Sequence, residues 1–256
     1  MTANELYAFL DARWPTSLRC EWDNDGRMCL PDPEKPVRKV LLTLDVTAGA
    51  VEAAILQGCD GIVAHHPLLF HPLKELYPGD IRAKKLLRML ENRLFCFCFH
   101  TRLDAAPGGV NDCLAGALCL RDVTPFEVET IPMGRIGRLP SPMSERELAL
   151  FCKERLGAPE VTYCSSGKKK IETVALLGGA GSDAIPAALA LGADAFVTGD
   201  LHYNYLIDPA EEGVTVYRCG HFETENPVLR EMKAALAAFD PSVETVEYFS
   251  LPTETV

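Results

Sequence analysis

The chain has 256 residues, of which 48% are hydrophobic and 24% charged, and its net charge is −11. This length and apolar content predict one large or two small globular domains with a buried core, and the negative charge argues against nucleic acid as a main partner. The longest apolar runs fall well short of the roughly 18 residues that a membrane span needs, and the first 14 residues have an amphipathic helical pattern rather than that of a signal peptide. We therefore expect a soluble, cytoplasmic protein without a membrane partner.

The ten cysteines do not indicate a disulfide framework. No Cys-x-x-Cys pair occurs, and Cys96 and Cys98 share one face of a predicted buried strand. Thiols in a reducing compartment are the simpler account of this placement, so a structural zinc site built from cysteine is not expected.

Apolar strands and helices alternate over the first half of the chain. The predicted elements, in order, are a strand at 38–46, a helix capped by Thr47 and ended near Gly58, a strand at 60–64, a helix capped by Asp80, a strand at 93–99 and a helix from 108 to 118. This alternation is typical of parallel βαβ units. Ligands of such sheets gather at the carboxyl ends of the strands.

The composition shifts to Pro, Gly, Met and Arg between residues 121 and 144, and we place a domain boundary there. A second α/β unit follows, opened by a capping box of Ser144 with Glu147. Its predicted elements are a helix ended by Gly157, strands at 160–164 and 172–177, a helix at 185–192, strands at 194–199 and 214–219, a helix at 227–239 and a last strand at 243–250. The basic run at 168–170 is interpreted as a solvated turn between two strands.

Histidines follow apolar strand runs at three places, namely the pair His65–His66, His100 and His221. Neighbouring strand residues point to opposite faces, but Pro67 cannot donate to a ladder and keeps His66 out of the helical region. We therefore expect the strand to end here, so that two divergent imidazoles can each reach a different metal ion. For the remaining two, His71 and His202, we expect at most a peripheral role.

Two carboxylates accompany these histidines at the same spacing, because Asp104 lies four residues after His100 and Glu225 four residues after His221. Glu225 also lies just before a predicted helix, whose N-terminus favours a carboxylate. Imidazoles with carboxylates and no thiolate suit Zn, Mn, Fe or Ni. Two such ions about 3.5–4 Å apart would activate a shared water and polarise a substrate.

Three further features allow two interpretations each. Asp45 either orients the site or caps the next helix, and the cap is favoured. The glycine turn at 178–182 resembles a phosphate cradle, but it lacks the full G-x-G-x-x-G pattern and a P-loop lysine, so a tight turn is favoured. Trp22–Asp23 is interpreted as a packed aromatic residue followed by a turn.

Together, GIVAHHPLLFHPLK, HTRLDAAPGGVND, FVTGD and GHFETENPVL, with EWDNDG near the start and GRIG at 134–137, resemble the GTP cyclohydrolase 1 type 2 homologue family, also called the NGG-interacting-factor-like family. The resemblance runs from about residue 5 to residue 250. It implies two interlocking α/β domains with a dinuclear metal site in the cleft between them, in the short form without an inserted domain. We expect residues 1–125 with 213–256 to form the metal-binding domain and residues 126–212 the second domain.

By its matching motifs, the resemblance also implies a ligand set for two divalent ions per chain: His65, His66, Asp104, His221 and Glu225. Glu225 would be shared between the ions, and His100 would line the pocket as the candidate catalytic residue. The resemblance further implies a homohexamer. One departure concerns the TGDxxxH arrangement of many members, because Asn204 stands at the histidine position and His202 lies two residues earlier. A proton-transfer role at that position is therefore in doubt.

The family name suggests opening of the imidazole ring of GTP, in which a water activated by the metals attacks C8 and formate leaves. Lys74, Arg102 and the turn at 178–182 are the candidates for contacts to GTP. Three hypotheses stay open at this point. They are a metal-dependent hydrolase with GTP as the nominal substrate, a non-catalytic protein for metal storage, delivery or insertion, and a scaffold whose metals are structural.

Overall fold

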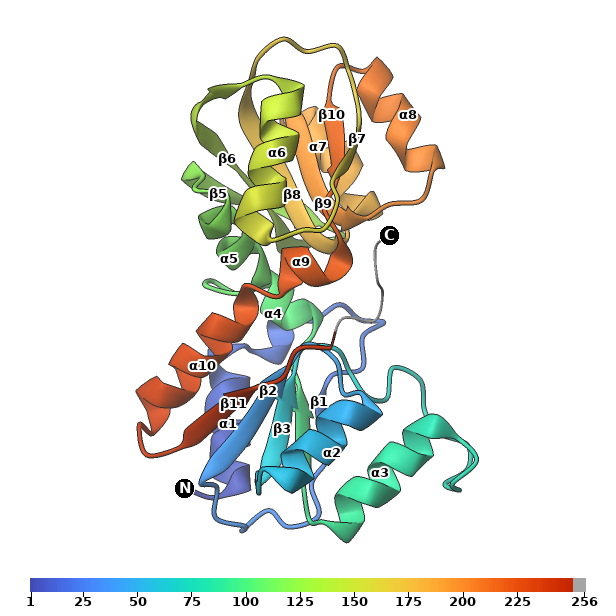
Figure 1. Cartoon of the computed structure of the whole chain (residues 1–256), viewed down its shortest axis with the longest axis vertical. Coiled ribbons are helices and arrows are strands. Elements are labelled where there is room, and N and C mark those ends of the chain that lie inside the picture. The colour runs from blue at the N-terminus through green and yellow to red at the C-terminus, as the bar shows by residue number, and fades with distance from the viewer. Residues whose placement is uncertain (251–256) are drawn as a thin grey trace. The chain divides into compact units, whose positions relative to one another are not determined.

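A computed structural model describes residues 1–250 of the chain, which divide into two compact units. The first unit comprises residues 1–103 and 229–250, and the second comprises residues 104–228. Each unit contains its own sheet (Figure 1). The boundaries differ from those expected at 125 and 213, because β5 (Arg121–Val128) spans the first of them and β10 (Thr215–Arg218) pairs in parallel with β9 (Ala195–Asp200) of the second sheet.

The first unit is a five-stranded sheet with helices on both faces. Its elements are α1 (Ala3–Arg13), η1 (Thr16–Leu18), β1 (Gly26–Cys29), β2 (Lys39–Thr43), α2 (Ala48–Leu56), β3 (Gly61–Ala64), α3 (Ile81–Glu91), β4 (Phe95–Cys98), most of α10 (Val228–Phe239) and β11 (Glu244–Glu247). The strand order is β1-β4-β3-β2-β11, with β1 antiparallel to β4 and the other pairs parallel. The predicted caps are confirmed, since Thr47 caps α2 and Asp80 caps α3.

Both faces of this sheet are buried, which explains why its strands read as continuous apolar runs. Ile62 of β3 and Cys96 of β4 pack in one core with α2 and α3. Successive strand residues point to opposite faces, so Phe97 lies on the other side, where its ring centroid is 5.0 Å from that of Tyr7 in α1. The sheet is therefore held between two helical layers.

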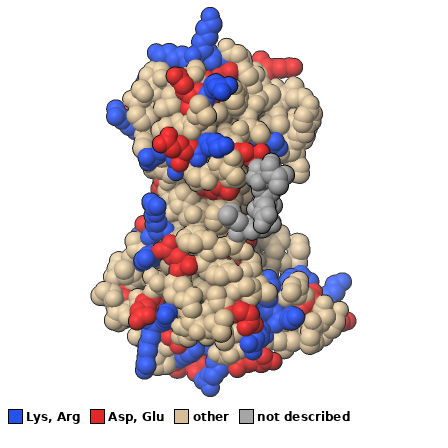
Figure 2. Space-filling model, viewed as in Figure 1, with Lys and Arg blue, Asp and Glu red and all other residues tan. Residues whose placement is uncertain are grey.

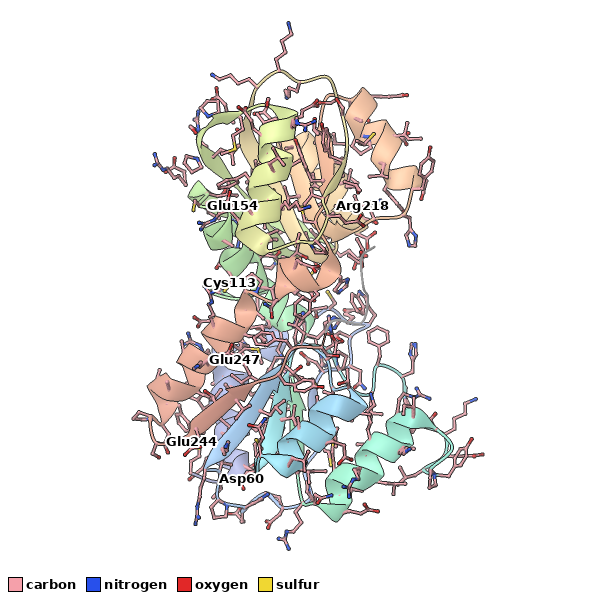
Figure 3. All side chains as sticks on the ribbon, viewed as in Figure 1. Asp60, Cys113, Glu154, Arg218, Glu244 and Glu247 are labelled. Carbon is pink, nitrogen blue, oxygen red and sulfur yellow. The ribbon has the colours of Figure 1, made fainter. Side chains whose placement is uncertain are left out.

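The outer strand β11 carries acidic side chains at both of its ends, Glu244 and Glu247 (Figure 3). Glu244 lies 3.5 Å from Lys39 Nζ, and Glu247 lies 3.1 Å from Lys233 Nζ. Charges on an edge strand disfavour pairing with another chain. The last predicted strand, placed at 243–250, thus exists as a short charged edge.

The second unit contains a six-stranded mixed sheet in the order β5-β6-β8-β9-β10-β7. Besides the strands already named, its elements are α5 (Val110–Ala117), β6 (Ile131–Met143), α6 (Glu145–Leu156), β7 (Thr162–Cys164), β8 (Ile171–Ala180), η2 (Ser182–Ala184), α7 (Ile185–Ala190), α8 (Asn204–Glu211) and α9 (His221–Glu225). Helices α5 and α6 pack through Leu114 and Leu148 on a core that includes Leu176 of β8 and Val197 of β9.

The segment at 121–144, expected to be a boundary between domains, is instead an antiparallel hairpin of β5 and β6. Its turn lies at Glu129 and Thr130, which both have positive φ. The prolines misled the prediction, because β5 is an edge strand and Pro125 can sit there without removing a ladder hydrogen bond from the sheet interior. The capping box of Ser144 and the left-handed Gly157 at the end of α6 are confirmed.

The charged surface residues, the cysteines and the helix lengths can be described briefly. On the face shown in Figure 2, Lys and Arg are interspersed with Asp and Glu rather than gathered in one basic patch. All ten cysteines fall within residues 1–250 and are thiols. No helix in this part of the chain is long and apolar enough to cross a bilayer.

Candidate metal centre

Three histidines of the first unit meet at the carboxyl edge of its sheet. His65 and His66 follow β3, His100 follows β4, and these strands are parallel neighbours. One ring nitrogen from each histidine lies within 4.8 Å of the others, and the ring centroids are 4.7–5.6 Å apart. The strand β3 ends at Ala64, as expected, and the two rings of the pair are tilted by 45° to each other; that each reaches a different metal ion stays a prediction. We call this group the three-histidine cluster.

An oxygen acceptor holds Nδ1 of every ring in this cluster. The acceptor is the Phe99 carbonyl for His65 at 2.9 Å, an Asp45 carboxylate oxygen for His66 at 2.9 Å, and an Asp23 carboxylate oxygen for His100 at 2.8 Å. Because carbonyls and ionised carboxylates only accept, Nδ1 is the donor and Nε2 presents its lone pair. This is the outer-shell arrangement that orients metal-ligating imidazoles.

Asp45 is therefore a residue that orients His66, and the favoured interpretation as a helix cap was wrong. The N-cap of α2 is Thr47, whose side chain accepts from the Ala50 N–H at 3.0 Å. Asp45 follows β2, next to β3 in the sheet, and so its carboxylate can reach across to His66. Its position at a strand end was the signal that the sequence offered.

Asp23 was missed by the sequence analysis, which assigned Trp22–Asp23 to a packed aromatic and a turn. Trp22 is 55% exposed, whereas Asp23 is buried. Asp23 accepts from the backbone N–H of Thr101 at 3.0 Å and from its hydroxyl at 2.7 Å, besides bonding His100. Burial opposes ionisation of Asp23, but the hydrogen bonds to His100 and Thr101 outweigh it and lower its pKa to about 2. At neutral pH, an ionised Asp23 carboxylate is therefore hydrogen-bonded to Nδ1 of His100.

Arg102, a candidate for contacting GTP, is fully buried and serves the fold of the first unit. Its guanidinium donates to both carboxylate oxygens of Asp25 at 2.8 and 3.0 Å, to Asp11 at 2.7 Å and to the Trp14 carbonyl at 2.9 Å. Burial disfavours the cation, but the hydrogen bonds to Asp25 and Asp11 raise the pKa of Arg102 above its usual value. The expected contact with GTP was therefore wrong. Lys74 is exposed, and its role stays a prediction.

The second unit contributes a histidine and a carboxylate from one face of α9. His221 and Glu225 are four residues apart on the helix, which places His221 Nε2 3.2 Å from Glu225 Oε1. His221 Nδ1 lies 2.9 Å from Asp200 Oδ2, so this ring is oriented in the same way as the three others. Glu225 is buried. Asp200 ends β9 and belongs to the FVTGD motif, which is how sequence reasoning could have found it.

Glycine at position 179 makes room for the Glu225 carboxylate. Gly179 has φ +65°, and a Cβ there would lie 2.2 Å from Glu225 Oε1. The N–H groups of Gly178 and Gly179 donate to Asn111 Oδ1 at 2.7 Å and to Thr224 Oγ1 at 3.1 Å. These two amides are thus engaged within the protein, which supports the tight turn over the phosphate cradle.

The remaining candidates have clear positions within their own units. Asp104 lies in α4 (Thr101–Ala105), half-buried, and its backbone carbonyl accepts from Asn111 Nδ2 at 3.1 Å. His71 and His202 are exposed, and the peripheral role expected for them stays a prediction. Asn204 begins α8 and is exposed as well.

These donors fit divalent metal ions. The two units offer imidazole nitrogens and carboxylate oxygens, which suit Zn, Mn, Fe or Ni. Every histidine among them has its Nδ1 on an oxygen.

Comparison with known proteins gives the family. The sequence profile of Duf34/NIF3 (NGG1p interacting factor 3) matches residues 1–255. The chain belongs to the Duf34/NIF3 family. A relative from Clostridium perfringens, named GTP cyclohydrolase 1 type 2 homolog, is 31% identical over 234 residues, which cover 90% of this chain and 88% of that protein. The resemblance inferred from the motifs is confirmed.

Two further comparisons extend the Duf34/NIF3 assignment. The Schizosaccharomyces pombe protein NIF3 homolog is 30% identical over 244 residues, covering 90% of this chain and 87% of its own. The crystal structure of a Bacillus cereus protein related to NIF3 matches with a TM-score of 0.89 at 23% identity, covering 100% of this chain and 99% of that one. This last likeness concerns the fold and confirms the mixed α/β class.

Proposed function

We propose that this Duf34/NIF3 protein is a hydrolase that uses two divalent metal ions. The ligands would be His65, His66, Asp104, His221 and Glu225, with Glu225 shared between the ions. The observation that carries the proposal is the common orientation of the histidines, each with Nδ1 donating to a carbonyl or carboxylate. Three of these rings, those of His65, His66 and His221, are the proposed ligands, and an oxygen on Nδ1 is the usual outer contact of a metal-bound imidazole.

Neither unit alone offers the full donor set that the proposal requires. The first unit has imidazoles, and the second has His221 with the carboxylates of Asp104 and Glu225. The two donor sets are adjacent in the sequence, because Asp104 follows His100 by four positions.

When bound, the ions would supply Lewis acidity that activates water for attack and stabilises developing negative charge. His100 is the proposed acid–base residue. Its Nδ1 donates to Asp23, so Nε2 is the atom that can take up a proton and return it. Asp23 stays ionised at neutral pH, since its pKa is about 2, and therefore stabilises the imidazolium that His100 becomes.

GTP is the nominal substrate because relatives such as the Clostridium perfringens protein are named GTP cyclohydrolase 1 type 2 homolog. The test is formate release from GTP by protein reloaded separately with Zn, Mn, Fe or Ni. His65→Ala is the loss-of-ligand variant, and His71→Ala is the matched control, since His71 is an exposed histidine outside the three-histidine cluster.

We expect metal-dependent formate from the wild type and from His71→Ala, and none from His65→Ala. Metal-loaded protein that releases no formate would remove GTP as the substrate. If it also fails to hydrolyse other esters and amides while exchanging its ions readily, metal storage or delivery becomes the better function.

A further inference from the structure

Two exposed aromatic rings stand beside His100 in the first unit. Trp22 is 55% exposed and Phe70 is 41% exposed. Their ring centroids lie 6.2 and 6.3 Å from that of His100 and 6.0 Å from each other. The other tryptophan of the chain, Trp14, is completely buried. Single exposed apolar side chains are common, but here two large rings are exposed around one candidate catalytic residue.

Hydrogen bonds anchor the backbone next to both rings. Trp22 directly precedes Asp23, which is buried and holds both His100 and Thr101. Asn24 donates from Nδ2 to the carbonyl of Leu69, the residue before Phe70, and so joins the two segments. A ring held on an anchored backbone loses little conformational freedom when a ligand binds, which favours affinity.

A flat molecule that stacks on one of these rings would meet the other ring at an angle. The Trp22 and Phe70 planes are tilted by 51° to each other, and both stand edge-on to His100, at 73° and 80°. Exposed aromatic faces attract the π-faces of other rings, and base–aromatic stacking tolerates any base. Arg102, a buried cation two positions after His100 in the sequence, is engaged with Asp25 and Asp11.

We propose that Trp22 and Phe70 form a stacking site for a planar heteroaromatic ring of the substrate, such as a purine, and place that ring beside His100. The inference rests on the proposed function only in taking His100 and its neighbours as the reaction centre. It assigns specificity to the ring of the substrate, whereas a hydrolase of simple phosphate esters or amides would have no use for such a surface.

The test is binding of guanosine, which has the ring and no phosphate, to the purified full-length chain. Calorimetry gives Kd, and tryptophan emission reports contact with the indole. Ribose 5-phosphate is the comparison ligand without a ring. Both titrations are repeated after chelation, because stacking needs no metal, so that a failure of stacking is distinguished from a failure of the metal-dependent reaction.

We expect Trp22→Ala to raise Kd for guanosine by about 5- to 150-fold, the range that stacking on one aromatic side chain gives. Trp22→Phe should keep Kd within a few fold and abolish the emission change, since only the buried Trp14 remains. Tyr77→Ala is the matched control, because Tyr77 is 52% exposed in the same unit.

Four results would overturn the proposal. They are no detectable guanosine binding, an unchanged Kd in Trp22→Ala, an emission change that survives in Trp22→Phe, and ribose 5-phosphate binding as tightly as guanosine. Formate release measured on the same preparations reports separately on the hydrolase.

Discussion

Removal of the Arg102 side chain should destabilise the first unit strongly. Arg102 and Asp25 are both fully buried, and the guanidinium makes two hydrogen bonds to that carboxylate. Asp11 is 37% exposed and can be hydrated again, so the main cost comes from Asp25. Breaking a buried ion pair by removing one partner costs about 3–5 kcal/mol. Loss of the cation contact with the Phe99 ring, at 4.8 Å, adds to that cost.

The assay is urea unfolding followed by Trp14 fluorescence in a Trp22→Phe background, because Trp14 is buried and its carbonyl accepts from Arg102. We expect Arg102→Met to lose about 3–5 kcal/mol, and Arg102→Lys, which keeps the charge, to lose less. Arg102→Met with Asp25→Asn should lose less than the sum of the two single variants, because no buried charge is then left uncompensated. A loss below about 1 kcal/mol in Arg102→Met would refute the structural role of this ion pair.

Three further predictions concern single residues. The pKa of Asp23 is lowered to about 2, which corresponds to about 2 kcal/mol of folding free energy. This stabilisation is present above the unfolded pKa near 4 and is lost as the pH falls through 2. In acid unfolding curves, the difference in stability between wild type and Asp23→Asn should therefore close between about pH 4 and pH 2. Gly179→Ala should displace the Glu225 carboxylate and reduce the amount of bound metal. The control is Gly192→Ala, which has a similar φ of +70° and nothing within 4 Å of the new Cβ, and it should keep its metal. Equal metal contents in the two variants would be evidence against steric displacement. Asp45→Ala should weaken metal binding about 10- to 100-fold in chelator competition, because His66 loses the acceptor that orients it, and unchanged affinity would exclude that role.

Strand and helix placement followed from the sequence wherever local signals agreed with the packing. Thr47, Asp80 and Ser144 cap helices as their spacing predicts, because a cap depends on the backbone within three residues. The β5–β6 hairpin could not be predicted from the sequence. Pro125 is tolerated because β5 lies at the edge of the sheet, and the order of strands in a sheet cannot be read from local sequence signals.

Some residues of the site could be predicted from the sequence, and others are brought together only by the tertiary fold. His65, His66 and His100 could be predicted as neighbours because strand ends of a parallel sheet share an edge. Asp23 could not, because it lies 77 residues from His100 and meets it only through the tertiary fold. Arg102 was misjudged for a related reason, since its burial depends on Asp11 and Asp25, which are distant in the sequence.

The metal content of purified protein tests the central claim most directly. Elemental analysis should find two divalent ions per wild-type chain. Because Glu225 would contact both ions, we expect Glu225→Ala to lose the full complement while circular dichroism stays that of a folded chain, and Glu223→Ala, a neighbour on α9 with its first-turn carboxylate, to retain it. Two ions per chain in Glu225→Ala, or none in the wild type after reloading, would contradict the account.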